Sequence, residues 1–235
     1  MSIIDFHSHI LPGVDDGSSS VEESIAMLRM EASQGIRHVI ATPHFYPRHD
    51  TLEGFLKRRK EAEERLREEM EKYDDLPQVT VGAEVCFFFG ISDSEVLKEL
   101  TIGEEKCNLI EMPYAAWTDS MYRELEQIYM KQGLLPLIAH VDRYLGRFRT
   151  YGIPERLESL PVLVQFNASA FCDFGSSGRA MRMLKKKQIH LLGSDCHNLR
   201  TRLPNLGAAV ANIKKRLGDD ALIHIEDYQN SVIHL

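Results

Sequence analysis

The sequence has few cysteines and arranges none of them as a metal-binding pair. Cys86, Cys107, Cys172 and Cys196 are its only four, and no CxxC occurs. This usage argues against a disulfide framework or a zinc–thiolate site. It favours a location in the reducing cytoplasm. No run approaches 18 apolar residues, so no membrane span is predicted. The N-terminus lacks the positively charged region of a secretory signal peptide.

Positive charge is also in deficit. The 28 lysines and arginines are outnumbered by 35 acidic residues, which gives a formal net charge of -7. We expect no block of basic residues to offset this balance, so general nucleic-acid binding is disfavoured. The chain has 235 residues, 43% of them hydrophobic, and can therefore bury a substantial core.

Apolar segments alternate with amphipathic ones along the chain. Seven segments read as strands: Ile3–Leu11, Ile36–His44, Gln78–Phe87, Asn108–Met112, Leu135–His140, Val162–Asn167 and His190–Gly193. Helical spacing follows in most gaps, over about 18–35, Thr51–Asp74, Ser120–Lys131, Gly178–Lys187 and Asn205–Leu217. The segment Asp219–Leu235 is ambiguous, and we interpret it as a helix.

Strand followed by helix, repeated about seven times, is typical of parallel βαβ units. No linker rich in proline, glycine or serine divides the chain. The sequence therefore predicts one α/β domain over residues 1–235. Its sheet is expected to be a closed or nearly closed barrel, with an open doubly wound sheet as the alternative.

Histidines and acids gather where the predicted strands end, which is where barrel active sites form. His7-Ser8-His9 places two imidazoles on one face of a strand, because residues i and i+2 point the same way. Candidate ligands come from several different strand ends: His7, His9, Asp16, His44, Glu84, Glu111, His140, Asp195 and His197. Spacing alone does not decide between Asp15 and Asp16. The remaining histidines have no assigned role, although His49 could line the mouth of the site.

The candidate ligands are imidazoles and carboxylates without a thiolate, a set that suits manganese, iron or zinc. Nine ligands are too many for one ion, so two or three ions are expected. Three divalent ions would outweigh the local acids and make the site positive inside an acidic protein. Such a site attracts an anion and favours attack on phosphorus by a metal-bound hydroxide.

Arg143 and Arg202 lie just past two of these strand ends and could clamp a phosphate in a bidentate manner. Cys196 and Arg202 also form C-x5-R, the spacing of cysteine-dependent tyrosine phosphatases. Their loop contains no glycine, and Cys196 lies in the middle of the DxH at Asp195–His197, so strand alternation turns it away from its neighbours. The metal mechanism is therefore favoured over a thiolate mechanism.

Several stretches together resemble a known family. They are DFHSHILPGVDDG at 5–17, GIRHVIATPHF at 35–45, GAEV at 82–85, AHVDR at 139–143 and GSDCHN at 193–198. Through them the whole chain resembles the polymerase-and-histidinol-phosphatase (PHP) superfamily. Within it, the chain is similar to the bacterial capsule-biosynthesis tyrosine phosphatases of the CpsB/CapC type. The resemblance implies a distorted (β/α)7 barrel.

The resemblance also implies three metal positions. One would use His7, His9, Glu84 and Asp195, the second Glu84, Glu111 and His140, and the third Asp16, His44 and His197. Arg143 and Arg202 match family arginines implicated in phosphate binding or catalysis. Family members depend on manganese and dephosphorylate the tyrosine autokinase that controls polysaccharide export. The expected activity is thus that of a protein-tyrosine phosphatase acting in capsule or exopolysaccharide synthesis.

Other functions stay open at this point. A PHP phosphatase of a small phosphomonoester such as histidinol phosphate would have the same ligands. A regulatory module that binds metal without catalysis is a rival of a different class. Glu22 and Glu23 are expected to complement a helix N-terminus, and a subunit contact there leaves an oligomer open. Tyr114, Trp117 and Tyr122 could rim the substrate mouth or pack in the core.

Overall fold

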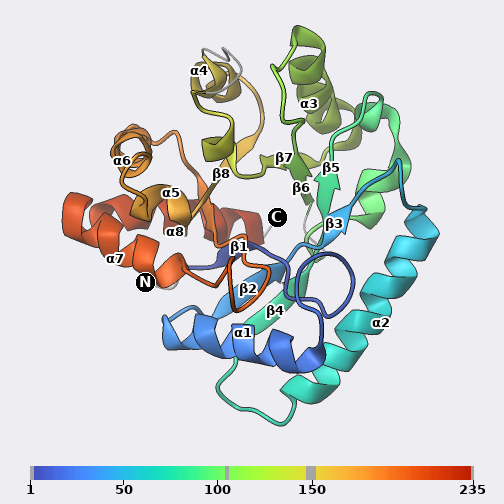
Figure 1. The fold of residues 1–235 in the computed structure, drawn as a ribbon. Helices are drawn as coiled ribbons and strands as arrows, with labels where there is room; N and C mark the ends of the chain where they lie inside the picture. The colour runs from blue at the N-terminus through green and yellow to red at the C-terminus, as the bar shows by residue number, and fades with distance from the viewer. Residues whose placement is uncertain (1–2, 104–105, 147–151, 234–235) are drawn as a thin grey trace.

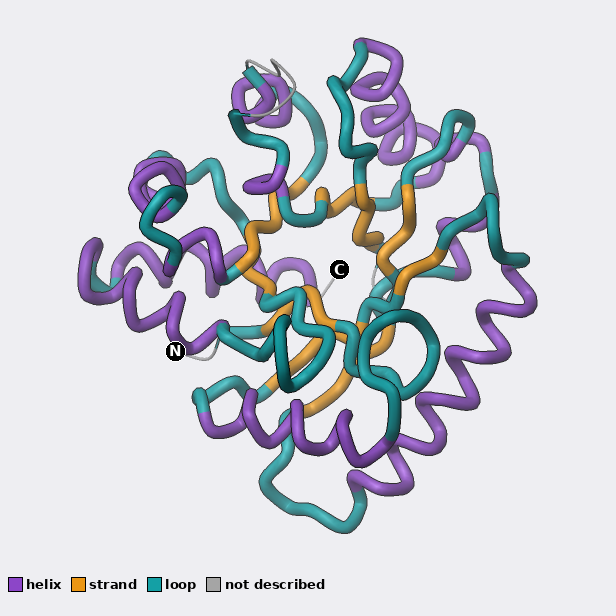
Figure 2. The backbone as a smooth tube through the Cα atoms, in the orientation of Figure 1, coloured by secondary structure: helices purple, strands orange, loops and turns teal. Residues whose placement is uncertain are grey.

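The fold is a curled parallel sheet covered on its outside by helices. The computed structural model describes residues 3–103, 106–146 and 152–233 (Figure 1). Every strand pairing among these residues is parallel. Figure 2 shows the strands curving around the centre of the molecule with the helices outside them. The predicted α/β class, built from parallel βαβ units, is confirmed.

The strands form two sheets. One has the order β1-β2-β4, with β1 at Asp5–Ser8, β2 at His38–Ala41 and β4 at Gln78–Val81. The other has the order β3-β5-β6-β7-β8-β9. Its strands are β3 (His44–Phe45), β5 (Glu84–Cys86), β6 (Cys107–Glu111), β7 (Leu135–Ile138), β8 (Leu163–Asn167) and β9 (Leu191–Gly193).

Two predicted strands are each broken in two, which corrects the sequence prediction. The segment Ile36–His44 forms β2 and β3, and Gln78–Phe87 forms β4 and β5. The break in the first comes at Pro43, which has no N–H to donate to a ladder. At the same level Gly82 N donates to Ala41 O (2.8 Å) and Glu84 N donates to Pro43 O (3.0 Å). Backbone hydrogen bonds therefore continue past Pro43 and join the two sheets.

The chain segment after β9 lies beside β1. Asp195 N donates to His7 O (2.7 Å), and His9 N donates to Cys196 O (2.9 Å). Ser8 and Cys196 form a parallel bridge. The first and last strands thus meet at their C-terminal ends, which brings two groups of predicted ligands together.

The helices follow the prediction in number and order for the longer elements. They are α1 (Val21–Ser33), α2 (Leu52–Met70), α3 (Asp119–Gln132), α6 (Ser177–Lys185), α7 (Leu206–Leu217) and α8 (Asp220–Ile233). The helical interpretation of the ambiguous C-terminal segment is confirmed by α8. Short elements escaped prediction: α4 (Ile153–Glu158), α5 (Ser169–Cys172), and the 3-10 turns η1 (Ile91–Asp93), η2 (Glu95–Glu99) and η3 (Val141–Arg143).

Local chemistry explains where the main helices begin and end. The hydroxyl of Ser20 accepts the N–H of Glu23 at the start of α1, and Thr51 accepts that of Gly54 at the start of α2. Gly133 ends α3 in the left-handed conformation, with φ of 66°. These caps set the helix ends that lead into and out of the strands.

Two apolar clusters hold the fold together. The larger lies mainly between the strands and the helices. The smaller contains Phe6, Ile40, Leu109, Leu137 and Leu191, which come from strands on different sides of the curl. It therefore fills the inside of the curled sheet and leaves the C-terminal strand ends for polar side chains. None of the described helices is long and apolar enough to cross a membrane.

Candidate metal centre and the cleft beside it

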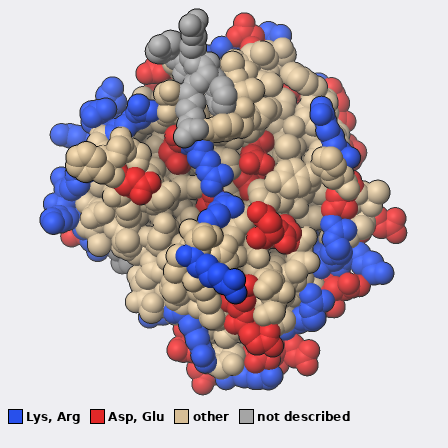
Figure 3. All heavy atoms as spheres, viewed as in Figure 1, with Lys and Arg blue, Asp and Glu red and all other residues tan. Residues whose placement is uncertain are grey.

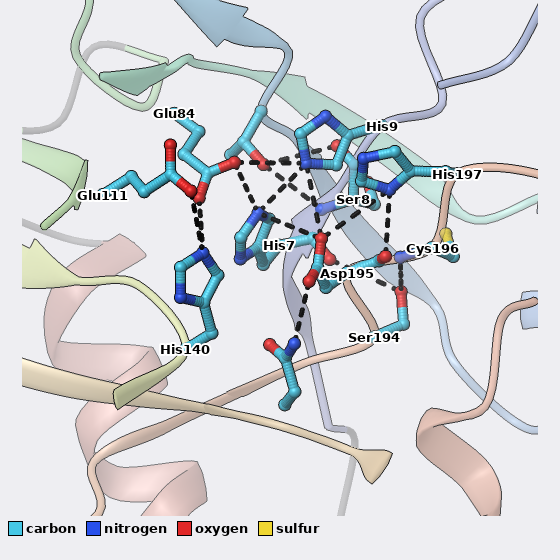
Figure 4. A network of polar contacts seen from close by, with 12 residues as sticks. His7, Ser8, His9, Glu84, Glu111, His140, Ser194, Asp195, Cys196 and His197 are labelled. Atoms are coloured by element: carbon cyan, nitrogen blue, oxygen red, sulfur yellow. Dashed lines mark hydrogen bonds and ion pairs between the residues drawn. The ribbon is translucent and has the colours of Figure 1, made fainter. Parts of the chain in front are cut away.

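The structure brings all nine predicted metal ligands together at one end of the curled sheet. Figure 4 shows most of them pointing toward one another from different strands. They come from β1 and the loop after it, from β3, β5 and β6, and from the turns that follow β7 and β9: His7, His9, Asp16, His44, Glu84, Glu111, His140, Asp195 and His197. All but Asp16, Glu111 and His44 are buried.

The first group centres on the two imidazoles of the HxH. Nε2 of His7 and Nε2 of His9 lie 3.1 Å apart. Glu84 Oε2 lies 3.1 Å from the former and 3.3 Å from the latter. Asp195 Oδ1 is 3.6 Å from both. Four donor atoms therefore converge on one point.

Two further groups adjoin the first. Asp16 Oδ1 lies 3.6 Å from His44 Nε2 and 3.5 Å from His197 Nε2. On the other side, His140 Nε2 lies 3.0 Å from Glu84 Oε1. Glu111 completes this group, with Oε1 3.6 Å from His140 Nε2. Glu84 contacts members of more than one group, as a bridging carboxylate would.

Neighbouring acceptors orient the HxH imidazoles. Asp15 Oδ2 lies 2.7 Å from Nδ1 of His9, and Gln165 Oε1 lies 3.2 Å from Nδ1 of His7. Each acceptor holds a proton on Nδ1 and leaves the Nε2 lone pair facing the centre. Asp15 also accepts the backbone N–H groups of Gly17 (2.9 Å) and His44 (2.8 Å). The two adjacent aspartates of the first loop therefore do different work: Asp15 orients, while Asp16 faces His44 and His197.

Sequence reasoning missed two buried residues of β8. Gln165 Oε1 accepts the backbone N–H of His140 at 2.6 Å, and Gln165 Nε2 donates to Asn167 Oδ1 at 3.1 Å. Asn167 Nδ2 donates to Asp195 Oδ2 at 2.8 Å. The two residues thus connect three ligands by hydrogen bonds. The available signal was a pair of amides at i and i+2 in the apolar strand LVQFN.

The carboxylates of the centre stabilise positive charge on its imidazoles. Burial lowers the pKa of His9, but Asp15 and Glu84 outweigh it and raise that pKa to about 10. Burial likewise lowers the pKa of His140, whereas its contacts with Glu111 and Glu84 raise it to about 9. Burial would raise the pKa of Glu84, yet the surrounding imidazoles hold it well below the ordinary value. The centre attracts protons strongly, and a metal cation would take their place.

The donor atoms fit a metal better than they fit one another. The two facing Nε2 atoms of the HxH cannot hydrogen-bond to each other when Nδ1 carries the proton in both rings. Glu84 Oε2 and His197 Nε2 are buried and lack a hydrogen-bond partner among the described residues. Three sets of these His, Asp and Glu atoms each lie within 4.8 Å of one another. Divalent cations would satisfy such atoms.

Behind the centre lies a second buried cluster of Asp5, Glu31 and Cys196, which sequence analysis also missed. Asp5 Oδ1 accepts the backbone N–H groups of Ser194 (2.8 Å) and His7 (3.1 Å). Burial raises the pKa of Asp5 and, still more, that of Glu31. Burial also raises the pKa of Cys196 well above its ordinary value, which keeps the thiol protonated. The thiolate alternative suggested by C-x5-R therefore has no support.

The two predicted arginines reach the centre from solvent. Arg143 Nη2 donates to Asp195 Oδ2, and Arg202 Nη2 donates to Asp195 Oδ1 at 2.5 Å. Their side chains are 39% and 35% exposed, whereas that of Asp195 is 2% exposed. Each guanidinium therefore stands between the buried carboxylate and the open side of the centre. Arg200 is exposed and has no such contact among the described ion pairs.

Clefts open on both sides of the ligands. The larger, of about 870 Å³, is lined by residues that include Glu111, His140, Arg143 and Arg179. Tyr114 is exposed and lines this cleft, whereas Trp117 and Tyr122 are buried and belong to the core. The smaller cleft, of about 270 Å³, is lined by residues that include Asp16, His44 and Tyr46.

The histidines without a predicted role have different surroundings. His49 lines the smaller cleft. His38 Nε2 contacts Thr80 Oγ1 at 2.8 Å, and His190 Nδ1 accepts the N–H of Val164 at 2.9 Å. His224 stacks edge to face on Tyr228. His234 lies outside the described residues.

Comparison with known proteins identifies the family of this chain. The family model for capsular polysaccharide synthesis proteins, CpsB/CapC, matches residues 3–233. The chain belongs to the CpsB/CapC family. It is 30% identical to the tyrosine-protein phosphatase YwqE of Bacillus subtilis, over 93% of this chain and 86% of that protein. It is 29% identical to the tyrosine-protein phosphatase CpsB of Streptococcus pneumoniae, over 92% and 91% of the two chains.

A solved structure agrees with the fold. A crystal structure from work on YwqE and on CpsB, described as unique metal-dependent tyrosine phosphatases, superposes with a TM-score of 0.86. The match covers 99% of this chain and 94% of that one, at 24% identity. The family-model match over residues 3–233 confirms the resemblance inferred from the motifs, at the level of the CpsB/CapC family.

Proposed function

We propose that this chain is a metal-dependent protein-tyrosine phosphatase. One observation carries the proposal: three adjoining groups of carboxylate and imidazole atoms share a rim with two half-exposed arginines, beside a large cleft. The tyrosine phosphatases to which the chain is about 30% identical support the same activity. Phosphotyrosine on a protein is the proposed substrate.

The arginines bind the phosphate in this proposal. A guanidinium matches the oxygens of a phosphoryl group in a bidentate manner, and its charge complements the transition state. Asp195 fixes both guanidinium groups from the buried side, so little freedom is lost when substrate binds. The tyrosyl oxygen leaves as a phenolate, whose pKa near 10 makes it an adequate leaving group without a strong general acid.

The larger cleft accepts the tyrosyl ring. Tyr114 and Tyr144 line it, with ring centroids 6.2 Å apart, and Met112 and Phe166 add apolar surface. Tyr144 is fixed because its hydroxyl donates to Met112 O at 2.7 Å. A flat aromatic group can lie against this aromatic and apolar wall while its phosphate reaches Arg143 and His140.

We propose two or three divalent ions, with Mn²⁺ as the physiological metal and Fe or Zn as substitutes. The first would be held by His7, His9, Glu84 and Asp195, the second by Glu84, Glu111 and His140, and the third by Asp16, His44 and His197. The mixed oxygen and nitrogen donors support this choice of metals. When bound, the metals would act as Lewis acids toward phosphate oxygens and lower the pKa of water.

The finer points of organisation are proposals too. Backbone pairing between the first and last strands supports a distorted (β/α)7 barrel of the PHP type, formed as one domain by residues 1–235. Four free cysteines support a reducing cytoplasmic location. We propose the tail of a bacterial tyrosine autokinase as substrate and a role in capsular or exopolysaccharide synthesis. An oligomer is compatible with this activity.

The deciding experiment compares two substrates on the purified protein. Chelation and dialysis, followed by addition of Mn²⁺, should abolish and then restore hydrolysis of a phosphotyrosine peptide. Histidinol phosphate should be hydrolysed at least tenfold more slowly at equal concentration. The reverse preference would replace the protein substrate with a small phosphomonoester. Full activity after chelation, or near-normal turnover of His7→Ala, would contradict the metal mechanism.

A further inference from the structure

The chain carries a strongly basic segment inside an acidic protein. From residue 174 to residue 218 it contains ten lysines and arginines but a single acid, Asp195. The net charge of the whole chain is -7, so the total hides this segment. The sequence-based expectation that no basic block offsets the acidity is therefore wrong. Asp195 is buried in the centre and does not reduce the charge of the surface.

Folding turns this segment into one face, which we call the α6–α7 basic face. It comprises Arg179, Arg182, Lys185, Lys186, Lys187, Lys214, Lys215 and Arg216, all of them exposed. In α6 and at its C-cap, Arg179, Arg182 and Lys186 have i, i+3, i+7 spacing and so share one side of the helix. Figure 3 shows lysine and arginine side chains gathered on the side where Figure 1 places α6 and α7.

Within the part of the chain that the structure describes, most cations of this face have no carboxylate partner. Among the described residues, only Lys214 of the face forms an ion pair, with Asp219 at 3.2 Å. By contrast, exposed cations elsewhere pair locally, such as Arg67 with Glu63 (2.7 Å) and Lys131 with Asp93 (2.6 Å). Unpaired like charges repel one another, so the face gains when an anionic partner covers it.

The face is continuous with the larger cleft. Arg179 lines the cleft together with Arg143 and the ligands Glu111 and His140. Its guanidinium lies against Gly146 in the loop that follows η3. A Cβ added to Gly146 would lie 3.0 Å from Arg179 Nη1. Gly146 is three residues after Arg143. Arg179 thus belongs both to the cleft that Arg143 lines and to the basic face on α6.

An exposed aromatic residue stands at the same edge. Phe174 is fully exposed, and its neighbours Asp173 and Gly175 line the cleft. Exposed aromatic residues beside arginines are typical of the parts of a surface that hold a partner. Of the acids that line the cleft, Asp173 is the exposed one, and the cations of the face outnumber it.

We propose that the α6–α7 basic face, with Phe174, binds acidic residues that flank the phosphotyrosine of the protein substrate. The inference rests on the proposed phosphatase function and adds a substrate class to it: phosphotyrosine within an acidic segment. Arg179 and Lys186 are about 10 Å apart along α6, from 1.5 Å of rise per residue. An extended peptide covers that length with about three residues. Aspartate or glutamate within about four residues of the phosphotyrosine can therefore reach the face.

The test compares two phosphotyrosine peptides that differ only in their flanks, aspartate and glutamate in one, asparagine and glutamine in the other. For the unmodified protein with Mn²⁺, KM for the acidic peptide should be about three- to tenfold lower, as expected for a few exposed ion pairs. The advantage should shrink as NaCl is raised from 50 to 300 mM. The kcat values should agree within about twofold.

Variants assign the preference to the face. The pair Arg182→Glu/Lys186→Glu should remove the preference, and the milder pair Arg182→Gln/Lys186→Gln should reduce it. The matched control is Lys57→Glu/Lys60→Glu on the exposed side of α2, which changes the net charge by the same amount and should keep the preference. p-Nitrophenyl phosphate is too short to reach α6, so its hydrolysis reports on an intact centre in every variant.

The outcomes separate this inference from the proposed function. Hydrolysis of both peptides without an acidic preference, or a preference that survives in Arg182→Glu/Lys186→Glu, would overturn the inference alone. Vesicles of anionic lipid that capture the protein through this face, without an acidic-peptide preference, would also overturn it. If no phosphate ester is hydrolysed, the proposed function fails. Fluorescence anisotropy of the labelled acidic peptide would then still show whether the face binds it.

Discussion

Asp15 Oδ2 lies 2.7 Å from Nδ1 of His9 and thereby turns Nε2 of that ring toward Glu84. Such a carboxylate fixes the tautomer and the rotation of a ligand before any metal arrives. The contact distinguishes the roles of two adjacent aspartates. Asp15 orients a ligand, whereas Asp16 lies among the ligands themselves. We therefore expect the centre to depend also on groups that do not themselves contact a cation.

Replacing Asp15 should weaken metal binding without unfolding the protein. Asp15→Asn keeps an acceptor but loses the charge, and we expect about tenfold weaker Mn²⁺ binding; Asp15→Ala should lose about 100-fold. Calorimetric titration of the metal-free protein measures this directly. Asp50→Asn is the control, because Asp50 lines the same small cleft but pairs with Arg58. Unchanged affinity in both Asp15 variants would refute the orienting role.

Replacing Gln165 should affect both stability and the metal. Gln165→Met keeps the shape but leaves Nδ1 of His7 and the backbone N–H of His140 without their acceptor. Each buried donor left unpaired costs about 1–3 kcal/mol, so urea unfolding should show a loss of about 2 kcal/mol or more. Mn²⁺ affinity should fall as well. Gln132→Met, which removes hydrogen bonds to Ile91 O and Ser92 O, should lower stability alone.

Cys196 should be dispensable for catalysis. Its side chain is buried, and its thiol stays protonated because burial raises its pKa. We expect Cys196→Ala to hydrolyse p-nitrophenyl phosphate within about threefold of the unmodified protein, a change in packing rather than in chemistry. In the folded protein, maleimide should label the exposed Cys172 but spare Cys196. Abolished turnover with the metal content intact would restore the thiolate mechanism.

Because of His190, the free energy of unfolding should depend on pH in the mildly acidic range. Burial, with a contribution from His224, lowers the pKa of His190 to about 4, and Nδ1 accepts the N–H of Val164. Between pH 6.5 and 4 the unfolded chain binds a proton that the folded chain refuses, so stability falls as pH falls through this window. The cost should reach about 1–3 kcal/mol near pH 4.

His190→Asn isolates this contribution, because the amide oxygen takes a position close to that of Nδ1 but does not titrate in this range. The free energy of unfolding of the variant, measured by urea at several pH values, should fall less steeply between pH 6.5 and 4 than that of the unmodified protein. Parallel curves would show that His190 does not couple protons to folding.

Local patterns in the sequence predicted the strand and helix order, because apolar periodicity and caps act over a few residues. The break of Ile36–His44 into β2 and β3 was not predictable in the same way. It depends on which neighbour the backbone pairs with on each side of Pro43, and that choice is made by the whole sheet. Helices as short as α5, with four residues, leave no periodicity to detect.

The candidate ligands were predictable because parallel strands deliver their C-terminal ends to one rim. The partners behind them were not. Gln165 and Asn167 look like ordinary strand residues until His7 and Asp195 are placed beside them. Glu31 reads as one acid in an amphipathic helix, and only packing against β1 reveals it as buried. Charge summed over the chain concealed the α6–α7 basic face, which counting in shorter windows would have found.

The contact between His7 O and Asp195 N joins positions far apart in the sequence. During synthesis, the first half of the centre leaves the ribosome long before its other half exists. A chain that ends before Asp195 and His197 therefore holds only an incomplete set of donors, and tight loading of metal must wait until these residues have been made. Loop closure over so many residues is also entropically slow. Metal content can thus serve as a check that the chains in a preparation extend past His197 and have closed correctly.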